Sequence, residues 1–74
     1  MKLSEFTELA DGVFGPALAR AFINETVLPG AEHLTARQAL ADGIPVRQVW
    51  TALCDEMNVP ESQRWEVPPE LRRR

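Results

Sequence analysis

The chain has 74 residues, of which 45% are hydrophobic and 26% are charged, and it carries a formal net charge of -3. This composition indicates one folded domain with a small core, because a chain of this length buries only about 60 to 65% of its unfolded surface. The single cysteine, Cys54, excludes an intramolecular disulfide, and the cysteine and histidine residues are too few for a structural zinc site. Without the arginines at 72–74, five basic side chains would face eleven acidic ones, which disfavours nucleic acid as a partner.

The amino-terminal segment MKLSEFTELADG has charges in its first turns and no continuous apolar run. This pattern is not that of a secretory signal or a membrane anchor. No later segment approaches the ~20 apolar residues that a transmembrane helix needs. Together with the single thiol, these features predict a cytoplasmic protein that makes no contact with a membrane.

A first helix is predicted to begin after Ser4, which is a suitable N-cap residue. Apolar residues then recur at helical spacing and form one stripe: Phe6, Leu9, Ala10, Val13 and Phe14. Three acidic residues fall on the other, solvated side: Glu5, Glu8 and Asp11. The sequence therefore predicts an amphipathic helix that packs one face against the rest of the chain.

The pair Gly15-Pro16 separates this helix from a second one, because proline disfavours helical geometry at the preceding residue but suits the first position of a helix. The second helix is predicted from Pro16 to about Thr26. Pro29-Gly30 then breaks the chain, and a loop is expected as far as Leu34. No alternating segment of useful length occurs anywhere, so no sheet is expected.

The next segment predicts two helices joined by a tight corner. Thr35 and Gln38 match a capping box at the start of the first, and Gly43 ends it because glycine adopts left-handed backbone geometry without steric cost. The second helix is predicted to start at Pro45 and to end at Asn58. It has the cleanest apolar stripe of the chain: Val46, Val49, Trp50, Leu53 and Met57. We expect this helix to form the centre of the core.

After Pro60, one helical turn is expected to bring Trp65 back toward the other helices. The predicted fold is all-α: a small irregular four-helix bundle over residues 1–66, followed by a flexible tail over residues 67–74. The tail has no apolar face and ends in three arginines, which have little to bury.

Three segments together carry a family resemblance: MKLSEF at the amino terminus, VFGPALARA at residues 13–21, and ALADGI..VRQVWTALC...NVP at residues 39–60. They resemble a family of small actinobacterial proteins that is classed only as a domain of unknown function and is often encoded beside recombination-regulator genes. The chain departs from the family pattern at Ile44, where members often have an acidic capping residue. The resemblance implies a small helical cytoplasmic protein and implies no activity, cofactor or site residue.

The corner between the last two helices partly matches a helix-turn-helix motif. The small, turn and buried positions of that motif are occupied by Ala39, Gly43, Ile44 and Val49. Gln38 and Asp42, however, stand at positions that are usually apolar. If the chain bound DNA through this motif, Arg47, Gln48 and Thr51 would face the bases, because their side chains suit base edges. An ordinary helical corner needs the same small residues, so nucleic-acid binding is the alternative hypothesis.

The preferred hypothesis is a non-catalytic module that binds another protein through Trp65 and the outer face of the last long helix. Tryptophan is enriched at the anchors of protein interfaces, and Trp65 lies outside the apolar stripes. The arginine cluster would add attraction to an acidic partner: Arg72, Arg73 and Arg74. A homodimer that completes its core between two chains is a third possibility.

The sequence contains no pattern that indicates catalysis, a metal site or a cofactor site. Cys54 has no histidine or other activating cation near it in the helical pattern, so a packing role is expected. His33, the only histidine, is expected to be a solvated loop residue. Trp50 lies on the apolar stripe and is expected in the core. We therefore expect that the protein is not an enzyme and that it binds no cofactor or metal ion.

Overall fold

The computed structural model describes residues 1–65, which contain four α-helices, two short 3-10 helices and one small antiparallel sheet. The α-helices are α1 (Leu3–Phe14), α2 (Pro16–Glu25), α3 (Ala36–Ala41) and α4 (Val46–Glu56). The strands are β1 (Val27–Leu28) and β2 (Leu34–Thr35), and the 3-10 helices are η1 (Pro29–Ala31) and η2 (Glu61–Gln63). The expected tail at 67–74 falls outside the described residues.

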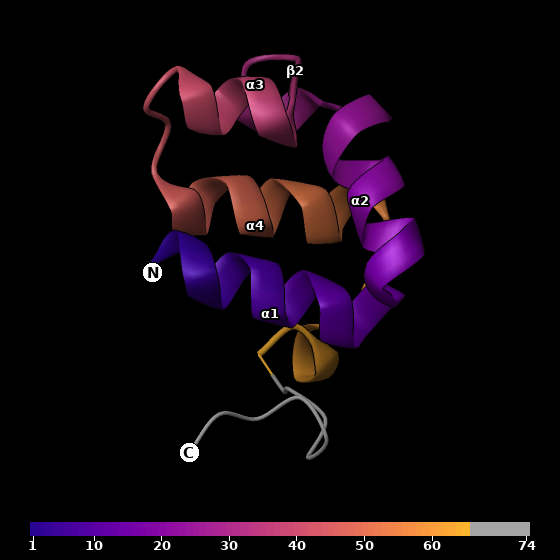
Figure 1. Cartoon of the computed structure of the whole chain (residues 1–74). Helices are drawn as coiled ribbons and strands as arrows, with labels where there is room; N and C mark the ends of the chain where they lie inside the picture. Colours follow the sequence, from indigo (N-terminus) through magenta and orange to yellow (C-terminus); the bar gives the residue numbers. More distant parts are fainter. Residues whose placement is uncertain (66–74) are drawn as a thin grey trace.

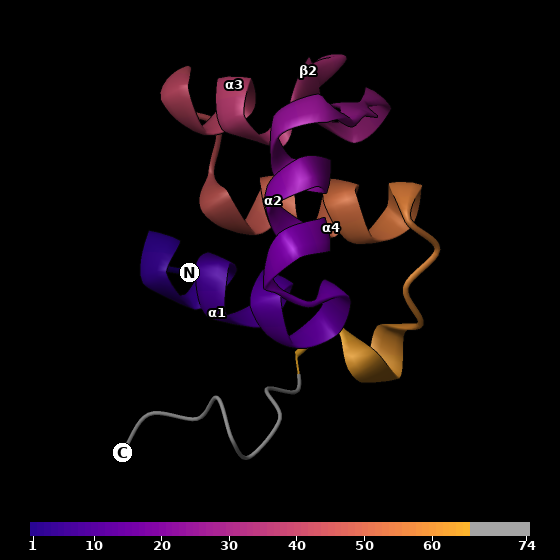
Figure 2. The same ribbon diagram turned by 45° about the vertical axis from the view of Figure 1, so that its right-hand side comes forward.

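Helix α4 is the middle layer of the molecule, with α3 on one side and α1 on the other (Figure 1). Helix α2 runs across one side of this stack, from the level of α1 to that of α3 (Figure 2). The prediction of a largely helical fold is confirmed. The elements form a stack of three helices crossed by a fourth, and a four-helix bundle in the strict sense is not confirmed.

The prediction that the chain has no sheet is wrong, because β1 and β2 pair antiparallel. The register joins two pairs of residues: Val27 with Thr35, and Leu28 with Leu34. Strands of two residues are too short to show an alternating pattern in the sequence. The chain reverses direction through left-handed backbone at Glu32 and His33, with φ of 59° and 61°. The His33 amide then donates to the carbonyl of Leu28 at 2.9 Å, which closes the turn.

The starts of α1 and α3 show how local hydrogen bonds set a helix boundary. Ser4 is not the N-cap of α1, because the helix starts at Leu3 and the Lys2 amide donates to Oε1 of Glu5 at 3.0 Å. A glutamate at the third helical position stabilises the start in this way. At α3, in contrast, the predicted capping box is confirmed, with both hydrogen bonds between Thr35 and Gln38 at 3.2 Å.

Helices α3 and α4 end where predicted and in the same way. Gly43 has a φ of +87°, and the amide of Ile44 donates to a carbonyl of the last turn of α3 at 3.0 Å. Asn58 has a φ of 57°, and the amide of Val59 donates to a carbonyl of α4 at 2.9 Å. In each case a left-handed residue lets the next apolar residue fold back onto the helix, which is the Schellman arrangement. Val59 is buried as a result.

The centre of the core is Trp50, which is fully buried as the sequence predicts. Its ring meets Phe6 and Phe14 edge-on, with centroid distances of 5.6 Å and 6.2 Å. Phe14 in turn meets Phe22 of α2 at 5.2 Å. Edge-to-face pairs add roughly 0.5 to 1.5 kcal/mol each beyond the burial of their surface. Aromatic contacts therefore connect α1 and α2 to α4.

Candidate functional site

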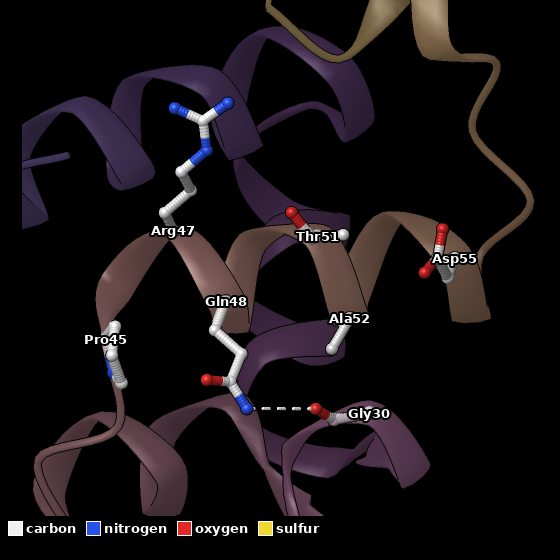
Figure 3. Close-up of a pocket in the computed structure, with 7 residues that line it drawn as sticks. All are labelled: Gly30, Pro45, Arg47, Gln48, Thr51, Ala52 and Asp55. Atoms are coloured by element: carbon white, nitrogen blue, oxygen red, sulfur yellow. Dashed lines mark hydrogen bonds between the residues drawn. The ribbon is translucent and has the colours of Figure 1, made fainter.

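Helix α4 has one flank in the core and one flank open to solvent. Its core flank is fully buried and consists of Val49, Trp50, Leu53 and Cys54. Its open flank lies between α1 and the α3–η1 side, and it carries four polar residues: Arg47, Gln48, Thr51 and Asp55. Positions four residues apart share a helix face, so Arg47, Thr51 and Asp55 lie along one row (Figure 3).

A shallow depression of about 460 Å³ lies on the open flank (Figure 3). It is lined by Gly30, Pro45, Arg47, Gln48, Thr51, Ala52 and Asp55. The η1 segment approaches α4 closely here, because a Cβ atom on Gly30 would lie only 3.1 Å from Cβ of Ala52. Nε2 of Gln48 donates to the carbonyl oxygen of Gly30 at 3.4 Å and connects the same two elements. The depression is therefore bounded by Gly30 of η1 on one side and by the short side chains of Thr51 and Ala52 of α4.

Arg47 stacks on Trp65, with 5.1 Å between its guanidinium carbon and the centroid of the indole ring. Trp65 remains 42% exposed. Such a cation–π contact contributes about 0.5 to 1 kcal/mol at an exposed site. The contact is with the π face of the ring, and within residues 1–65 the N–H groups of Arg47 donate no hydrogen bond. Within residues 1–65 no carboxylate pairs with Arg47.

Arg64 holds the segment after α4 in place. Nε of Arg64 donates to the carbonyl oxygen of Val59 at 3.0 Å. Its guanidinium group lies 2.8 Å from Oδ1 of Asp55 and 3.5 Å from Oε2 of Glu61. The Arg64 side chain is only 12% exposed, so its hydrogen bond to the backbone is partly shielded from water. We call these contacts the Arg64 clasp.

The backbone of Arg64 adds a link to the core. Nε1 of Trp50 donates to the carbonyl oxygen of Arg64 at 3.1 Å, which satisfies a buried indole N–H that would otherwise lose a hydrogen bond. The next residue along the chain is Trp65. The clasp therefore fixes the position of Trp65 beside Arg47. Trp65 belongs to the predicted protein-binding site and Arg47 to the alternative nucleic-acid site, and the fold brings the two residues into contact.

Residues 1–62 match the family described as protein of unknown function (DUF3046). The chain belongs to this family. The match confirms the expected membership of an uncharacterised domain family, while taxonomic range and gene neighbourhood stay predictions. The DUF3046 match ends before Arg64 and Trp65, whereas the residues that Arg64 contacts, Asp55, Val59 and Glu61, lie within the matched part. Comparisons with curated proteins and with solved structures gave no match.

The residues of the nucleic-acid hypothesis lie together on the open flank of α4, as the helical spacing predicts. Two features make these residues less suited to DNA than the sequence suggested. The Gln48 side-chain amide already donates a hydrogen bond to the carbonyl oxygen of Gly30, and the negatively charged Asp55 stands in the same row as Arg47 and Thr51. Gln38 and Asp42, which the motif would bury, are both exposed. The predicted binding residues Arg72, Arg73 and Arg74 lie outside the described part of the chain.

Arg64 is the residue that the sequence pattern did not identify. An arginine in a short polar turn is expected to be solvated, whereas the side chain of Arg64 is only 12% exposed. One local signal was present, because Glu61 and Arg64 are three residues apart in a predicted helical turn. The contacts with Val59 and with Trp50 have no counterpart in local spacing, so they became visible only in the fold.

Cys54 is fully buried on the core flank of α4, in agreement with the expected packing role. Burial raises the pKa of Cys54 to about 12, because the thiolate would lose its hydration, and the smaller effects are those of Arg64, which lowers the pKa, and of Asp55 and Glu61, which raise it. The thiol is therefore protonated at neutral pH and is a poor nucleophile. His33 is exposed in the turn between β1 and β2, as expected.

Residues 1–65 contain neither a cluster of metal ligands nor a membrane-spanning helix. No group of three or more His, Cys, Asp or Glu side chains in this range is arranged to hold a metal ion. Every helix within the same residues is too short or too polar to cross a membrane.

Proposed function

We propose that this chain is a non-catalytic protein-binding module whose partner docks on the open flank of α4. We call this surface the α4 face, and it consists of Arg47, Gln48, Thr51, Asp55 and Trp65. The observation that carries the proposal is an exposed tryptophan stacked on an arginine beside an open depression. Tryptophan and arginine are enriched among the residues that dominate binding energy at interfaces.

The stacked pair is also ordered before a partner arrives. Arg47 is held by the indole ring, and Trp65 is held by its neighbour Arg64 through the clasp. Immobilising a long side chain on binding costs roughly 0.5 to 1.5 kcal/mol, so a side chain that is already fixed reduces this cost. The α4 face therefore has the pre-organisation that favours docking.

The non-catalytic part of the proposal is supported by the chemistry of the α4 face. Nucleophilic catalysis requires a nucleophile within hydrogen-bond reach of a base, and the hydroxyl of Thr51 has no such partner within residues 1–65. The thiol of Cys54 lies on the other flank of α4, buried in the core. The proposal also includes a cytoplasmic location, where a single free thiol stays reduced.

Site-directed photocrosslinking in cells tests this proposal. A photoreactive amino acid replaces Thr51 on the α4 face, and in a control chain it replaces Asn24, which is exposed on α2. We expect defined protein adducts from position 51, their loss when Arg47→Glu is added, and no such adducts from position 24. If position 51 gives no protein adduct, or if its adducts persist unchanged with Arg47→Glu, the proposal is wrong.

Nucleic-acid binding is the second candidate, because the exposed Arg47 and Gln48 and the half-buried Thr51 lie on the open flank of α4 after the α3–α4 corner. Asp55 and the exposed Glu56 on the same helix would repel phosphates. A duplex titration at low and high salt distinguishes the candidates, since phosphate contacts make affinity fall steeply with salt. Duplex binding at low salt that Arg47→Ala abolishes would favour this second function over protein binding.

A further inference from the structure

The α4 face has charges of opposite sign at its two ends. Arg47 stands near the amino end of α4 and Asp55 near its carboxyl end, each four residues from Thr51. A helix rises 1.5 Å per residue, so the two charged positions are about 12 Å apart along the axis. If a second such helix packs antiparallel with Thr51 opposite Thr51, each Arg47 lies opposite an Asp55. The row is therefore complementary to itself.

Both charged side chains have binding capacity left within residues 1–65. The Arg47 guanidinium lies over the Trp65 ring, and its N–H groups have no carboxylate partner within these residues. The Asp55 side chain is 64% exposed and its contact with Arg64 is at Oδ1, so the carboxylate has room to accept a second guanidinium group at Oδ2. A planar arginine fork matches a carboxylate well, so Arg47 of another chain fits this acceptor.

The middle of the α4 face permits close approach. Thr51 and Ala52 have short side chains, and the depression extends from them to Gly30, which has none. Packed helices lie 8 to 10 Å apart, and the shorter distances require small residues at the crossing point. Trp65 stands at the edge of this surface and adds exposed apolar area to it.

We propose that the partner on the α4 face is a second copy of this chain, docked antiparallel about a two-fold axis that passes near Thr51. This inference rests on the proposed function, because it names the partner for the same surface. A two-fold contact uses every pair twice, so one Arg47–Asp55 match gives two ion pairs. The two chains repel each other through their net charge of -3, and the alternation of sign along α4 selects the antiparallel alignment.

The dimer is expected to be weak. A contact centred on one helix from each chain buries an area at the low end for specific complexes, below about 1,200 Å² in total. Ion pairs at an exposed edge are also weakened by salt. The self-association therefore dissociates on dilution and shifts toward monomer as salt is raised.

Sedimentation velocity from about 10 μM to about 1 mM protein tests the inference. Arg47→Glu places two acidic residues opposite each other, and Asp55→Arg places two basic ones, so each variant alone should dimerise at least about tenfold more weakly than the unmodified chain. An equimolar mixture of the two variants restores both opposite-charge pairs. We expect the mixture to regain a dimer that neither variant forms alone at the same concentration.

Matched variants on α2 control for net charge. Arg20→Glu and Glu25→Arg make the same charge changes at exposed positions away from the α4 face, and they should leave dimerisation unchanged. Thr51→Arg places two cations at the axis and does not touch the Asp55–Arg64 pair, so the test does not depend on the folding of Asp55→Arg. Circular dichroism and thermal unfolding verify that each variant is folded.

A monomer at every concentration overturns the inference, as does a dimer that Arg47→Glu and Thr51→Arg leave unchanged. A mixture of charge variants that stays monomeric contradicts the antiparallel register. If the chain is monomeric but position 51 still gives adducts with another protein, the inference of a dimer is wrong and the proposed protein-binding function stands. If position 51 gives no adduct of any protein, both are wrong.

Discussion

The two flanks of α4 are built from the same eleven-residue helix and have opposite properties. The core flank carries a fully buried tryptophan, a fully buried thiol and two aliphatic side chains. The open flank carries charges of both signs and a shallow depression. The helical period places the residues that stabilise the fold on one flank, whereas packing does not restrict which side chains stand on the other flank. Substitutions on the core flank should change the free energy of unfolding, whereas those on the open flank should change association.

The largest effect is expected for Trp50→Ala. This variant loses the edge-to-face contacts with Phe6 and Phe14 and the hydrogen bond to the Arg64 carbonyl, so the free energy of unfolding should fall by about 3 to 5 kcal/mol. Urea denaturation followed by circular dichroism measures the change. The matched variant is Trp65→Ala, which removes one exposed cation–π contact and should cost no more than about 1 kcal/mol. Equal costs for the two tryptophans would contradict the division of α4 into two flanks.

Alkaline pH should lower the free energy of unfolding of the chain, because the buried thiol of Cys54 on the core flank resists ionisation. Its ordinary pKa is 9.0, whereas burial raises the pKa of Cys54 to about 12 in the folded chain. The unfolded chain therefore releases the thiol proton first, so the contribution of Cys54 to the free energy of unfolding is fully present below pH 9 and is lost as the pH rises from 9 to 12. The slope approaches about 1.4 kcal/mol per pH unit.

The same titration in Cys54→Ala provides the control, because alanine has no proton to release. The chain has no tyrosine that would titrate in the same range. Chemical denaturation at several pH values should show a falling stability for the unmodified chain and a flatter curve for the variant. Parallel curves would mean that the thiol does not cause the alkaline loss.

An intermediate effect is expected at the Arg64 clasp, which joins the two flanks. Arg64→Met keeps an apolar stem and removes the hydrogen bond to Val59 and both ion pairs. Most of the loss comes from the partly shielded hydrogen bond, because ion pairs with exposed carboxylates contribute little. The expected cost is about 1 to 2 kcal/mol in urea denaturation. We also expect Trp65 to become more accessible to iodide quenching, and an unchanged quenching constant would show that the clasp does not position the indole.

The smallest effect on stability is expected for Thr51→Arg. Position 51 is at the centre of the open flank, and a substitution there should change the free energy of unfolding by no more than about 0.5 kcal/mol. The same variant should lose self-association. A large destabilisation in urea denaturation would show that Thr51 belongs to the packed structure rather than to a docking surface.

The features that the sequence predicts well are those encoded by neighbouring residues. Three features follow from signals within one or two helical turns: the capping box of Thr35 and Gln38, the helix ends at Gly43 and Asn58, and the burial of Trp50. Such signals need no knowledge of the fold, because the hydrogen bonds or faces involved are local.

The features that the sequence did not predict depend on competition between neighbouring capping residues or on contacts between residues that are far apart in the chain. Ser4 is a good N-cap residue, but Glu5 reaches back to the Lys2 amide and starts α1 earlier. The β1–β2 pair depends on a turn with two left-handed residues that are not glycine. The hydrogen bond from the Trp50 indole to the Arg64 carbonyl oxygen joins residues that are 14 positions apart in the chain. The meeting of Arg47 with Trp65 follows from the Arg64 clasp, so helical periodicity alone could not reveal it.

A series of ¹H–¹⁵N correlation spectra at increasing protein concentration tests the central claim most directly, because it observes both flanks of α4 together. We predict concentration-dependent shifts at the amides of Arg47, Gln48 and Thr51 and at the indole of Trp65. The indole resonance of Trp50, which is buried and bonded within the chain, should stay fixed. Spectra that do not change with concentration, or shifts confined to α2, would contradict the account.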